Sequence, residues 1–254
     1  MTQTALVQFR HVRKSWQNLT AIDNFTLDIE RGEFIALVGS SGCGKSTLLR
    51  LLVGLEPDFQ GEICVDGLPV TGIGRDRGIV FQEPRLFPWL TVEQNVALGL
   101  ADAPLGRNAK RERVAHMLEL VQLTGFAHSL PAQLSGGMAQ RVAIARGLAA
   151  SPEILMLDEP FGALDALTRQ QMQQELLHIH QTQRTTTLIV THDVDEAVTL
   201  ADRIVVMSPR PGRILEIVDI RQPHPRARDS DAFTSRCAHI RALITQTESF
   251  AGAH

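Results

Sequence analysis

The feature that most constrains this chain is a glycine-rich segment that follows a continuous apolar run at residues 34–38. The segment fits the phosphate-binding pattern G-x-x-x-x-G-K-[ST], and its residues are Gly39, Ser40, Ser41, Gly42, Cys43, Gly44, Lys45, Ser46 and Thr47. Backbone N–H groups can point at a phosphate only where small residues let the chain approach closely. The segment therefore predicts a strand, a nucleotide-binding loop and a helix at 46–53, with Lys45 at the β- and γ-phosphates and Ser46 as a ligand of Mg²⁺.

A second glycine-rich turn, formed by Ser135, Gly136 and Gly137, opens an apolar-periodic helix predicted over 138–149. Ser135 can cap this helix, and the two glycines expose N–H groups at its positive end. A generic capped helix explains the serine but not two glycines, which weaken a helix start. Because one triphosphate rarely needs two such cradles from one subunit, the two segments predict a homodimer. Each subunit would lend its second turn to the ATP held by its partner.

Two carboxylates follow a buried apolar strand that is predicted at 154–157. Asp158 would stand at the carboxyl edge of the sheet, where a carboxylate can hold Mg²⁺. Glu159, the next residue, is placed to polarise the attacking water as a general base. Acidic residues are also common in solvated turns after strands, and that simpler interpretation stays open when the pair is taken alone.

The remaining chain alternates between strand and helix patterns. Residues 5–30 alternate loosely, as half-buried antiparallel strands do, and residues 84–134 are predicted to form a mainly helical insert. Further strands are predicted at 78–82, 187–191, 204–207 and 214–220, and further helices at 111–123, 167–181, 195–200 and 236–246. Such alternation predicts an α/β fold in which crossover helices connect the strands of a parallel sheet.

Composition limits the cellular setting of the protein. Lys+Arg 25 and Asp+Glu 28 give a formal net charge of −3, which offers no field for holding nucleic acid. No run approaches the ~20 apolar residues that cross a bilayer, and residues 1–10 lack the basic start and apolar core of a signal peptide. The three cysteines have neither metal-binding spacing nor an even number for disulfides, so a reduced, cytosolic setting is expected.

The sequence LSGGMAQR at 134–141 completes a set of motifs through which the chain resembles the ATP-binding cassette (ABC) family over roughly residues 6–235. The resemblance implies a parallel-sheet core of the P-loop NTPase (RecA-like) type. It also implies an N-terminal antiparallel β-subdomain, a helical subdomain at about 84–150 and a tail helix at 236–254. In that family this string, the signature, contacts the γ-phosphate of the nucleotide on the opposite subunit. Met138 stands where the family usually has Gln, so a modest effect on affinity is expected.

Four further residues match motifs of the family in the right order. Gln82, within VFQE, resembles the Q-loop glutamine, which senses Mg²⁺ and water. Asp165, within GALD, resembles the D-loop aspartate, which reaches across the dimer. His192, which follows the strand predicted at 187–191, resembles the switch histidine that holds the γ-phosphate during hydrolysis. Trp16 stands where the family places an aromatic residue that stacks on adenine, and packing within the β-subdomain is the alternative.

Proteins with such cassettes serve membrane transporters or act on DNA or the ribosome. The chain has neither the coiled-coil insertion nor the second cassette of the nucleic-acid-associated members, and a separate, short cassette is the importer arrangement. FQEPRLFPWLTV at 81–92 and VVMSPRPGRI at 205–214 resemble segments of importers for aliphatic sulfonates, taurine and nitrate. Length and the chain's ending after the last strand favour aliphatic sulfonates among these solutes. Taurine or nitrate import is the alternative within the family, and a soluble nucleic-acid-associated ABC ATPase is the alternative from another class.

The resemblance also implies partners and cofactors. The homodimer is expected to bind ATP and Mg²⁺ and to dock, through the insert, on two permease subunits at the cytoplasmic face of the inner membrane. A periplasmic or extracellular solute-binding protein is expected to deliver the solute. Phe87, Pro88 and Trp89 would line the groove for a permease helix, and internal packing of these three residues is the alternative.

Overall fold

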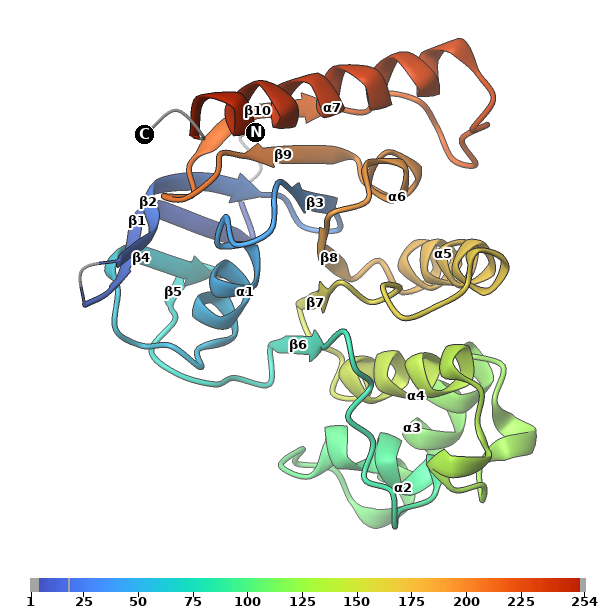
Figure 1. Ribbon diagram of the computed structural model, residues 1–254. Coiled ribbons are helices and arrows are strands. Elements are labelled where there is room, and N and C mark those ends of the chain that lie inside the picture. Colours follow the sequence, from blue (N-terminus) through green and yellow to red (C-terminus); the bar gives the residue numbers. More distant parts are fainter. Residues whose placement is uncertain (1–4, 18, 252–254) are drawn as a thin grey trace. The chain divides into compact units, whose positions relative to one another are not determined.

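Two compact units form the chain in the computed structural model, which describes residues 5–17 and 19–251, with side chains up to residue 246. The first unit comprises Met1–Gly74 and Thr186–His254, and the second comprises Arg75–Thr185 (Figure 1). None of the described helices is both long enough and apolar enough to cross a bilayer.

An antiparallel sheet opens the first unit, as the alternation in residues 5–30 predicts. Its strands, in the order β2-β1-β4-β5, are β2 (Leu19–Ile29), β1 (Val7–Trp16), β4 (Gln60–Val65) and β5 (Leu68–Pro69). Alternate side chains face a core in which the rings of Phe9 and Phe25 meet edge to face, with their centroids 5.3 Å apart. The sequence did not indicate β4 and β5.

A second sheet of the first unit carries the phosphate-binding segment. Its strands lie in the order β10-β9-β3-β8, and their bounds are Ile214–Asp219, Arg203–Met207, Phe34–Val38 and Thr186–Thr191. All of these pairs are parallel except β10 with β9. Val38 lies opposite both Thr191 and Val206, so the chain leaves β3, β8 and β9 at one edge of the sheet. Every residue of β3 and β8 is buried, which is typical of parallel strands covered on both faces.

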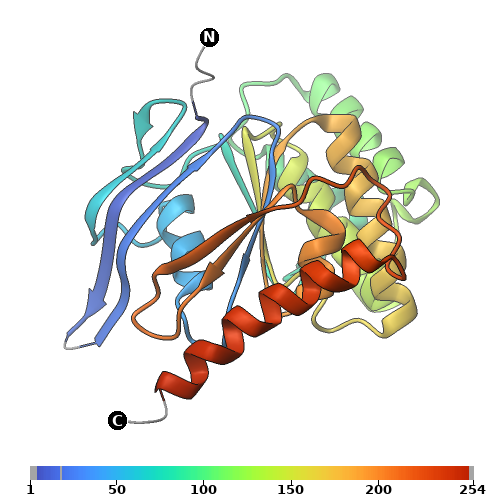
Figure 2. The same cartoon turned by 90° about the horizontal axis from the view of Figure 1, so that it is seen from above.

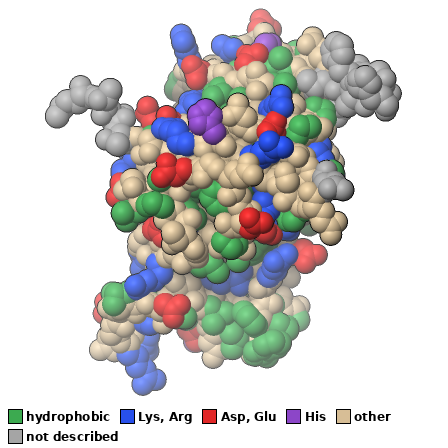
Figure 3. Space-filling view, turned by 90° about the vertical axis from the view of Figure 1, so that its left-hand side faces the viewer, with side chains coloured by type: hydrophobic (Ala, Val, Ile, Leu, Met, Phe, Trp, Pro, Cys, Tyr) green, Lys and Arg blue, Asp and Glu red, His purple; other side chains and the backbone are tan. Residues whose placement is uncertain are grey.

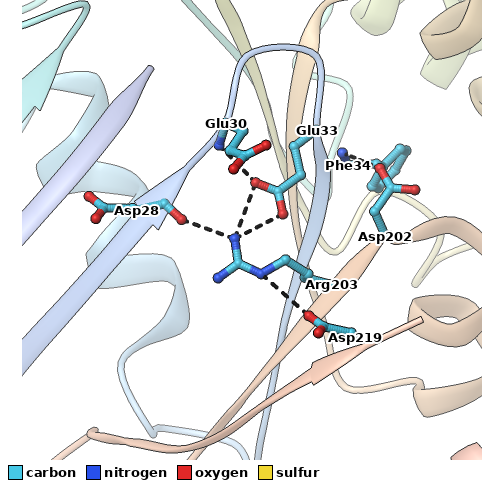
Figure 4. A network of polar contacts seen from close by, with 7 residues as sticks. All are labelled: Asp28, Glu30, Glu33, Phe34, Asp202, Arg203 and Asp219. Carbon is cyan, nitrogen blue, oxygen red and sulfur yellow. Dashed lines mark hydrogen bonds and ion pairs between the residues drawn. The ribbon is translucent and has the colours of Figure 1, made fainter. Parts of the chain in front are cut away.

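An ion-pair network holds the opposite edge of this sheet, where β3 begins (Figure 4). Nη1 of Arg203 donates to the Glu33 carboxylate at 3.0 and 3.3 Å and to the Asp28 carbonyl at 3.1 Å. Burial raises the pKa of Glu33, while a backbone N–H and the charge of Arg203 oppose that shift. The network fixes the turn that leads into the strand before the phosphate loop.

Helix α7 (Asp231–Ala251) begins earlier than the predicted start at 236, and residues 252–254 of the expected tail lie outside the described residues. It packs against β9 and against α6 (Val194–Leu200) (Figure 2). Cys237 is buried in this contact, and its thiol donates to Oδ1 of Asp195 at 3.1 Å.

The second unit pairs two parallel strands and surrounds them with helices. The strands are β6 (Arg77–Val80) and β7 (Ile154–Asp158), and the helices are α2 (Val92–Ala97), α3 (Arg107–Leu120), α4 (Gly136–Leu148) and α5 (Ala166–Gln183). Between residues 84 and 134 the described elements are α2, α3 and short 3₁₀ turns, as expected for the helical insert. The predicted fold class, a parallel core with an N-terminal antiparallel sheet and a helical insert, is confirmed.

Candidate nucleotide-binding site

The phosphate-binding segment connects β3 to α1 (Lys45–Val53) through left-handed backbone conformations. Gly42 has a φ of 78° and Gly44 has a φ of 100°, values that residues other than glycine rarely adopt. Gly44 is constrained a second time, because a Cβ there would lie 2.3 Å from Cδ1 of Ile22. Glycine at 44 therefore lets the start of α1 lie directly against β2.

Lys45 places its ammonium group within this loop. Nζ donates to the carbonyl oxygens of Gly39 at 2.8 Å and Ser40 at 3.0 Å, and only 6% of the residue is exposed. The loop thus joins a cation to the N–H groups that begin a helix, and both attract phosphate oxygens. Cys43 lies behind the lysine, fully buried, with Sγ 3.6 Å from Nζ.

His192 follows β8 at the same edge of the sheet as the phosphate loop. The parallel register pairs Thr191 with Val38, so His192 and Gly39 are the next residues on neighbouring strands. His192 is exposed, and the following residue, Asp193, caps α6 by accepting the N–H of Asp195 at 2.9 Å. The predicted position of the histidine beside the phosphate loop is therefore present within the first unit.

Trp16 ends β1 and is 37% exposed, so its ring is not part of the core. Nζ of Lys14 lies 5.2 Å from the ring centroid, close enough for a cation–π contact. The same ammonium lies 3.7 Å from Oε2 of Glu56, and the Lys14 side chain is almost fully buried. Stacking of adenine on Trp16 stays a prediction.

Gln82, Asp158 and Glu159 come together in the second unit. β6 and β7 are parallel, with Val80 opposite Leu157, so all three residues leave the pair at one edge. Glu159 has a φ of 46°, which is strained for a residue with a side chain and is common at functional positions. The turn that follows brings Gly162 close to the glutamine, because a Cβ on Gly162 would lie 3.0 Å from Nε2 of Gln82.

The signature turn caps α4 as its residues predict. Oγ of Ser135 accepts the N–H of Met138 at 3.2 Å, and Ser135 and Gly136 are exposed. Gly137 is buried, and a Cβ there would lie 2.8 Å from Cγ2 of Thr168 in α5. The second glycine of the signature is therefore also required by the packing of α5 on α4.

Asp165 caps α5 with its carboxylate. The side chain accepts the N–H groups of Leu167 and Thr168 at 3.1 Å and the Thr168 hydroxyl at 2.6 Å. The hydroxyl contact is the largest cause of the lowered pKa of Asp165. Its role across a dimer stays a prediction.

Two side chains of α4 that the sequence did not single out hold the segment around Gln82. Nε2 of Gln140 donates to the carbonyl of Phe81 at 3.4 Å, and Gln140 is buried. Arg146 donates to the carbonyls of Pro84 at 2.7 Å and Arg85 at 2.9 Å, and burial lowers its pKa. Gln140 could have been found from the sequence, because it lies among apolar residues of the predicted helix and a buried amide needs a hydrogen-bond partner.

The candidate residues divide between the two units. Within the first lie Trp16, the 39–47 loop and His192; within the second lie Gln82, Ser135, Gly136, Gly137, Asp158, Glu159 and Asp165. Among the described residues, no group of three or more His, Cys, Asp or Glu side chains is placed to hold a metal.

The fold and the phosphate loop define a P-loop nucleotide-binding protein. The model of the ABC transporter family matches residues 22–162. The aliphatic sulfonates import ATP-binding protein SsuB of Bacillus cereus is 44% identical over 243 residues, which cover 96% of this chain and 94% of the relative. The chain belongs to the ABC transporter family, as the motifs predicted.

Other relatives and solved structures agree with this assignment. A putative ATP-binding protein of Brucella abortus is 53% identical over 220 residues, covering 87% of this chain and 85% of that protein. The dimeric, post-hydrolysis structure of the ATP-binding cassette MJ0796 bound to ADP and Pi has a TM-score of 0.73 at 33% identity, with 85% of this chain and 100% of that chain covered. The structure of cbiO1 from Clostridium perfringens, part of the ABC transporter complex cbiONQ, has a TM-score of 0.78 at 28% identity, with coverage of 86% and 90%. The expected ABC-type ATPase fold is confirmed.

Proposed function

We propose that this chain is the ATP-hydrolysing subunit of an import complex that takes up aliphatic sulfonates through a separate permease. One observation carries the proposal. This chain shares 44% identity, along 96% of its length, with an aliphatic sulfonates import ATP-binding protein. It also has both the phosphate loop at 39–47, here called the Lys45 loop, and the signature helix that Ser135 caps. Such a subunit works at the cytoplasmic face of the membrane, bound to its permease.

Two copies of the chain form the complete site in this proposal. Each ATP binds between the Lys45 loop of one copy and the exposed Ser135–Gly136 turn of the other. The Lys45 loop leads into the start of α1, and the Ser135–Gly136 turn leads into the start of α4, so each presents N–H groups at a helix start. The two helices attract the same phosphates from opposite sides. Release of the cleaved phosphate removes what the second helix start binds, so the dimer opens once Pi has left. MJ0796, which is bound to ADP and Pi as a dimer, supports this arrangement.

Glu159 accepts a proton from the attacking water in the proposed reaction, and His192 and Gln82 orient the water and the γ-phosphate. The hydroxyl of Ser46, the amide oxygen of Gln82 and the Asp158 carboxylate are all oxygen donors, the type that Mg²⁺ prefers. These oxygens would hold Mg²⁺, which would neutralise negative charge on the phosphates when bound. The parallel register of β6 and β7 supports this role, because Glu159 leaves the pair at the same edge as Gln82 and Asp158.

The permease docks on the insert in this proposal. Figure 3 shows hydrophobic side chains gathered in the second unit, at the bottom of the view. Phe87 is 43% exposed and Trp89 is 70% exposed, and their rings meet at 5.4 Å between centroids. The buried side chain of Asn95 in α2 holds the segment before α2 in place. It accepts the N–H of Phe87 at 2.8 Å and donates to the Phe87 carbonyl at 3.2 Å.

A groove of about 790 Å³ in the same unit is lined by α2, α3 and the 124–128 segment, and the predicted residues Phe87, Pro88 and Trp89 are not among its lining residues. Glu93 and Ala97 of α2 line it together with Val114, Leu118 and basic side chains of α3. Apolar and charged side chains together in one groove suit an amphipathic helix. We therefore assign the groove to a cytoplasmic helix of the permease.

Uptake into proteoliposomes tests the proposal. The chain is reconstituted with a candidate permease and solute-binding protein from the same organism, and ATP-driven uptake of an alkanesulfonate, taurine and nitrate is compared. We expect alkanesulfonate uptake with the native chain and none with Glu159→Gln, which should instead remain an ATP-bound dimer in size-exclusion chromatography. Uptake of taurine or nitrate alone would reassign the solute. ATP turnover that responds to DNA or RNA and not to the permease would reject the transport role.

A further inference from the structure

The loop at 208–213, between β9 and β10, lies against the phosphate loop. It leaves β9 at the sheet edge where β3 ends. Met207, just before it, is so close to Gly39 that a Cβ on Gly39 would lie 2.9 Å from the Met207 carbonyl oxygen. Ser208 holds the loop in shape, because Oγ donates to the Pro211 carbonyl at 3.0 Å and accepts the N–H of Arg213 at 2.9 Å.

Arg210 reaches from this loop to the phosphate loop itself. Nε and Nη2 of Arg210 both donate to the carbonyl oxygen of Gly42, each at 3.3 Å. The same peptide unit is held at its other end, where the N–H of Cys43 donates to the Ser40 carbonyl at 3.3 Å. The peptide between Gly42 and Cys43 is thus fixed on both sides.

Gly212 makes the second contact. A Cβ on Gly212 would lie 2.0 Å from the carbonyl oxygen of Cys43, so only glycine allows this approach. Its N–H donates to the Ala21 carbonyl at 2.8 Å, and its carbonyl accepts the N–H of Asp23 at 3.0 Å. The loop at 208–213 therefore lies between β2 and the phosphate loop and touches both.

We propose that Arg210 is a positioning residue for nucleotide binding, which sets the orientation of the Gly42–Cys43 peptide through the loop at 208–213. The Cys43 N–H is used within the loop, but its peptide leads directly into Gly44 and Lys45, where α1 begins. Phosphate loops bind through the N–H groups at such a helix start, so affinity depends on how well the peptide planes are oriented before the ligand arrives. Arg210 supplies that orientation from outside the loop with two N–H donors in a fixed plane, which a lysine cannot reproduce. The inference rests on the proposed binding of ATP by the Lys45 loop.

Arg213 offers a matched control within the same loop. It carries the same charge, but its guanidinium pairs with Asp23 of β2 and not with the phosphate loop. Arg210→Ala and Arg213→Ala therefore change the net charge near the site equally. Only the first variant releases the carbonyl of Gly42.

Isothermal titration with ADP and steady-state ATP hydrolysis test the inference. We expect Arg210→Ala to weaken ADP binding and raise the KM for ATP about fivefold relative to Arg213→Ala, because two long hydrogen bonds to one carbonyl are lost. The kcat at saturating ATP should differ less than about twofold between them, because no group that touches the reacting atoms has changed. Arg210→Lys, which keeps the charge, should recover only part of the affinity.

Thermal unfolding without nucleotide separates positioning from folding. We expect Arg210→Ala and Arg213→Ala to unfold at similar temperatures; if the first is less stable, the comparison is made with Arg210→Lys. Gly212→Ala should weaken ADP binding at least as much as Arg210→Ala, because its Cβ displaces the Cys43 carbonyl. Equal ADP affinity of the Arg210 and Arg213 variants would overturn the inference. If Lys45→Ala loses ADP binding while the Arg210 and Arg213 variants bind equally well, the inference fails and the proposed function stands.

Discussion

The side-chain amide of Gln140 donates to the main-chain carbonyl of Phe81, and this contact joins the signature helix to the residue before Gln82. The same helix holds the next part of the segment through Arg146, which donates to the carbonyls of Pro84 and Arg85. A movement of α4 must therefore carry the 81–85 segment with it or break these contacts. In the proposed function, α4 meets the partner's nucleotide and the 81–92 segment meets the permease, so one helix connects both events.

Replacement of Gln140 by alanine should weaken that connection. We expect Gln140→Ala to reduce permease-stimulated ATP turnover about threefold, while ADP affinity stays unchanged, because ADP lacks the γ-phosphate that Gln82 is proposed to orient. Stimulation is measured in proteoliposomes against the basal rate of the same variant. Gln171→Ala, an exposed glutamine of α5, is the control, and equal stimulation in the two variants would contradict the prediction.

Gly44 should tolerate no side chain. We expect Gly44→Ala to weaken ADP binding at least tenfold, because the new Cβ combines a left-handed backbone with a position 2.3 Å from Ile22. Gly67→Ala is the control, since Gly67 has a φ of 74° but nothing within 4 Å of the added Cβ. Titration calorimetry measures both, and undiminished binding by the Gly44 variant would remove this part of the loop from the site.

Arg141 should stabilise the second unit through Glu175. The two side chains pair at 2.6 Å and are only 16% and 17% exposed, and burial raises the pKa of Glu175 against the effect of Arg141. We expect Arg141→Ala to lower the free energy of unfolding by about 2 kcal/mol at neutral pH, because a buried carboxylate loses its partner.

The loss in Arg141→Ala should also depend on pH. Because the pKa of Glu175 is higher in the folded chain than its value near 4.5 in the unfolded chain, Glu175 stabilises the fold fully only below pH 4.5. This contribution is lost as the pH rises through the pKa of the folded chain. Removal of Arg141 raises the pKa of Glu175 in the folded chain further. The variant should therefore lose less stability near pH 4.5 than at neutral pH. Urea unfolding at both conditions checks this, and a loss that does not change with pH would contradict it.

Cys237 should make the protein sensitive to alkali. Burial and the bond to Asp195 raise the pKa of its thiol from 9.0 to about 12. The thiol therefore stabilises the fold fully below pH 9.0, and this contribution is lost as the pH rises toward 12, since thiolate forms first in the unfolded chain. We expect the free energy of unfolding to fall less steeply above about pH 9 in Cys237→Ala than in the native chain. Parallel curves from urea unfolding would show that Cys237 does not titrate in this way.

Local chemistry allowed much of this protein to be predicted from its sequence. The glycine-rich 39–47 segment indicates a loop between a strand and a helix, Ser135 indicates a helix cap, and the apolar run before Asp158 indicates a buried strand, because each depends on residues within one turn or strand. The same reasoning placed Lys45 within its loop. It missed β4 and β5 (residues 60–69), where short strands with exposed residues give little periodic signal.

Tertiary structure alone decided the contacts that hold those local pieces in place. Arg210 and Gly42 lie 168 positions apart, and Gln140 and Phe81 lie 59 positions apart. No local propensity encodes such pairs, since they arise only when strand register and helix packing bring distant residues together. The sequence by itself therefore determined which groups are candidates for nucleotide binding. Their orientation depends on side chains that only the folded chain brings beside them.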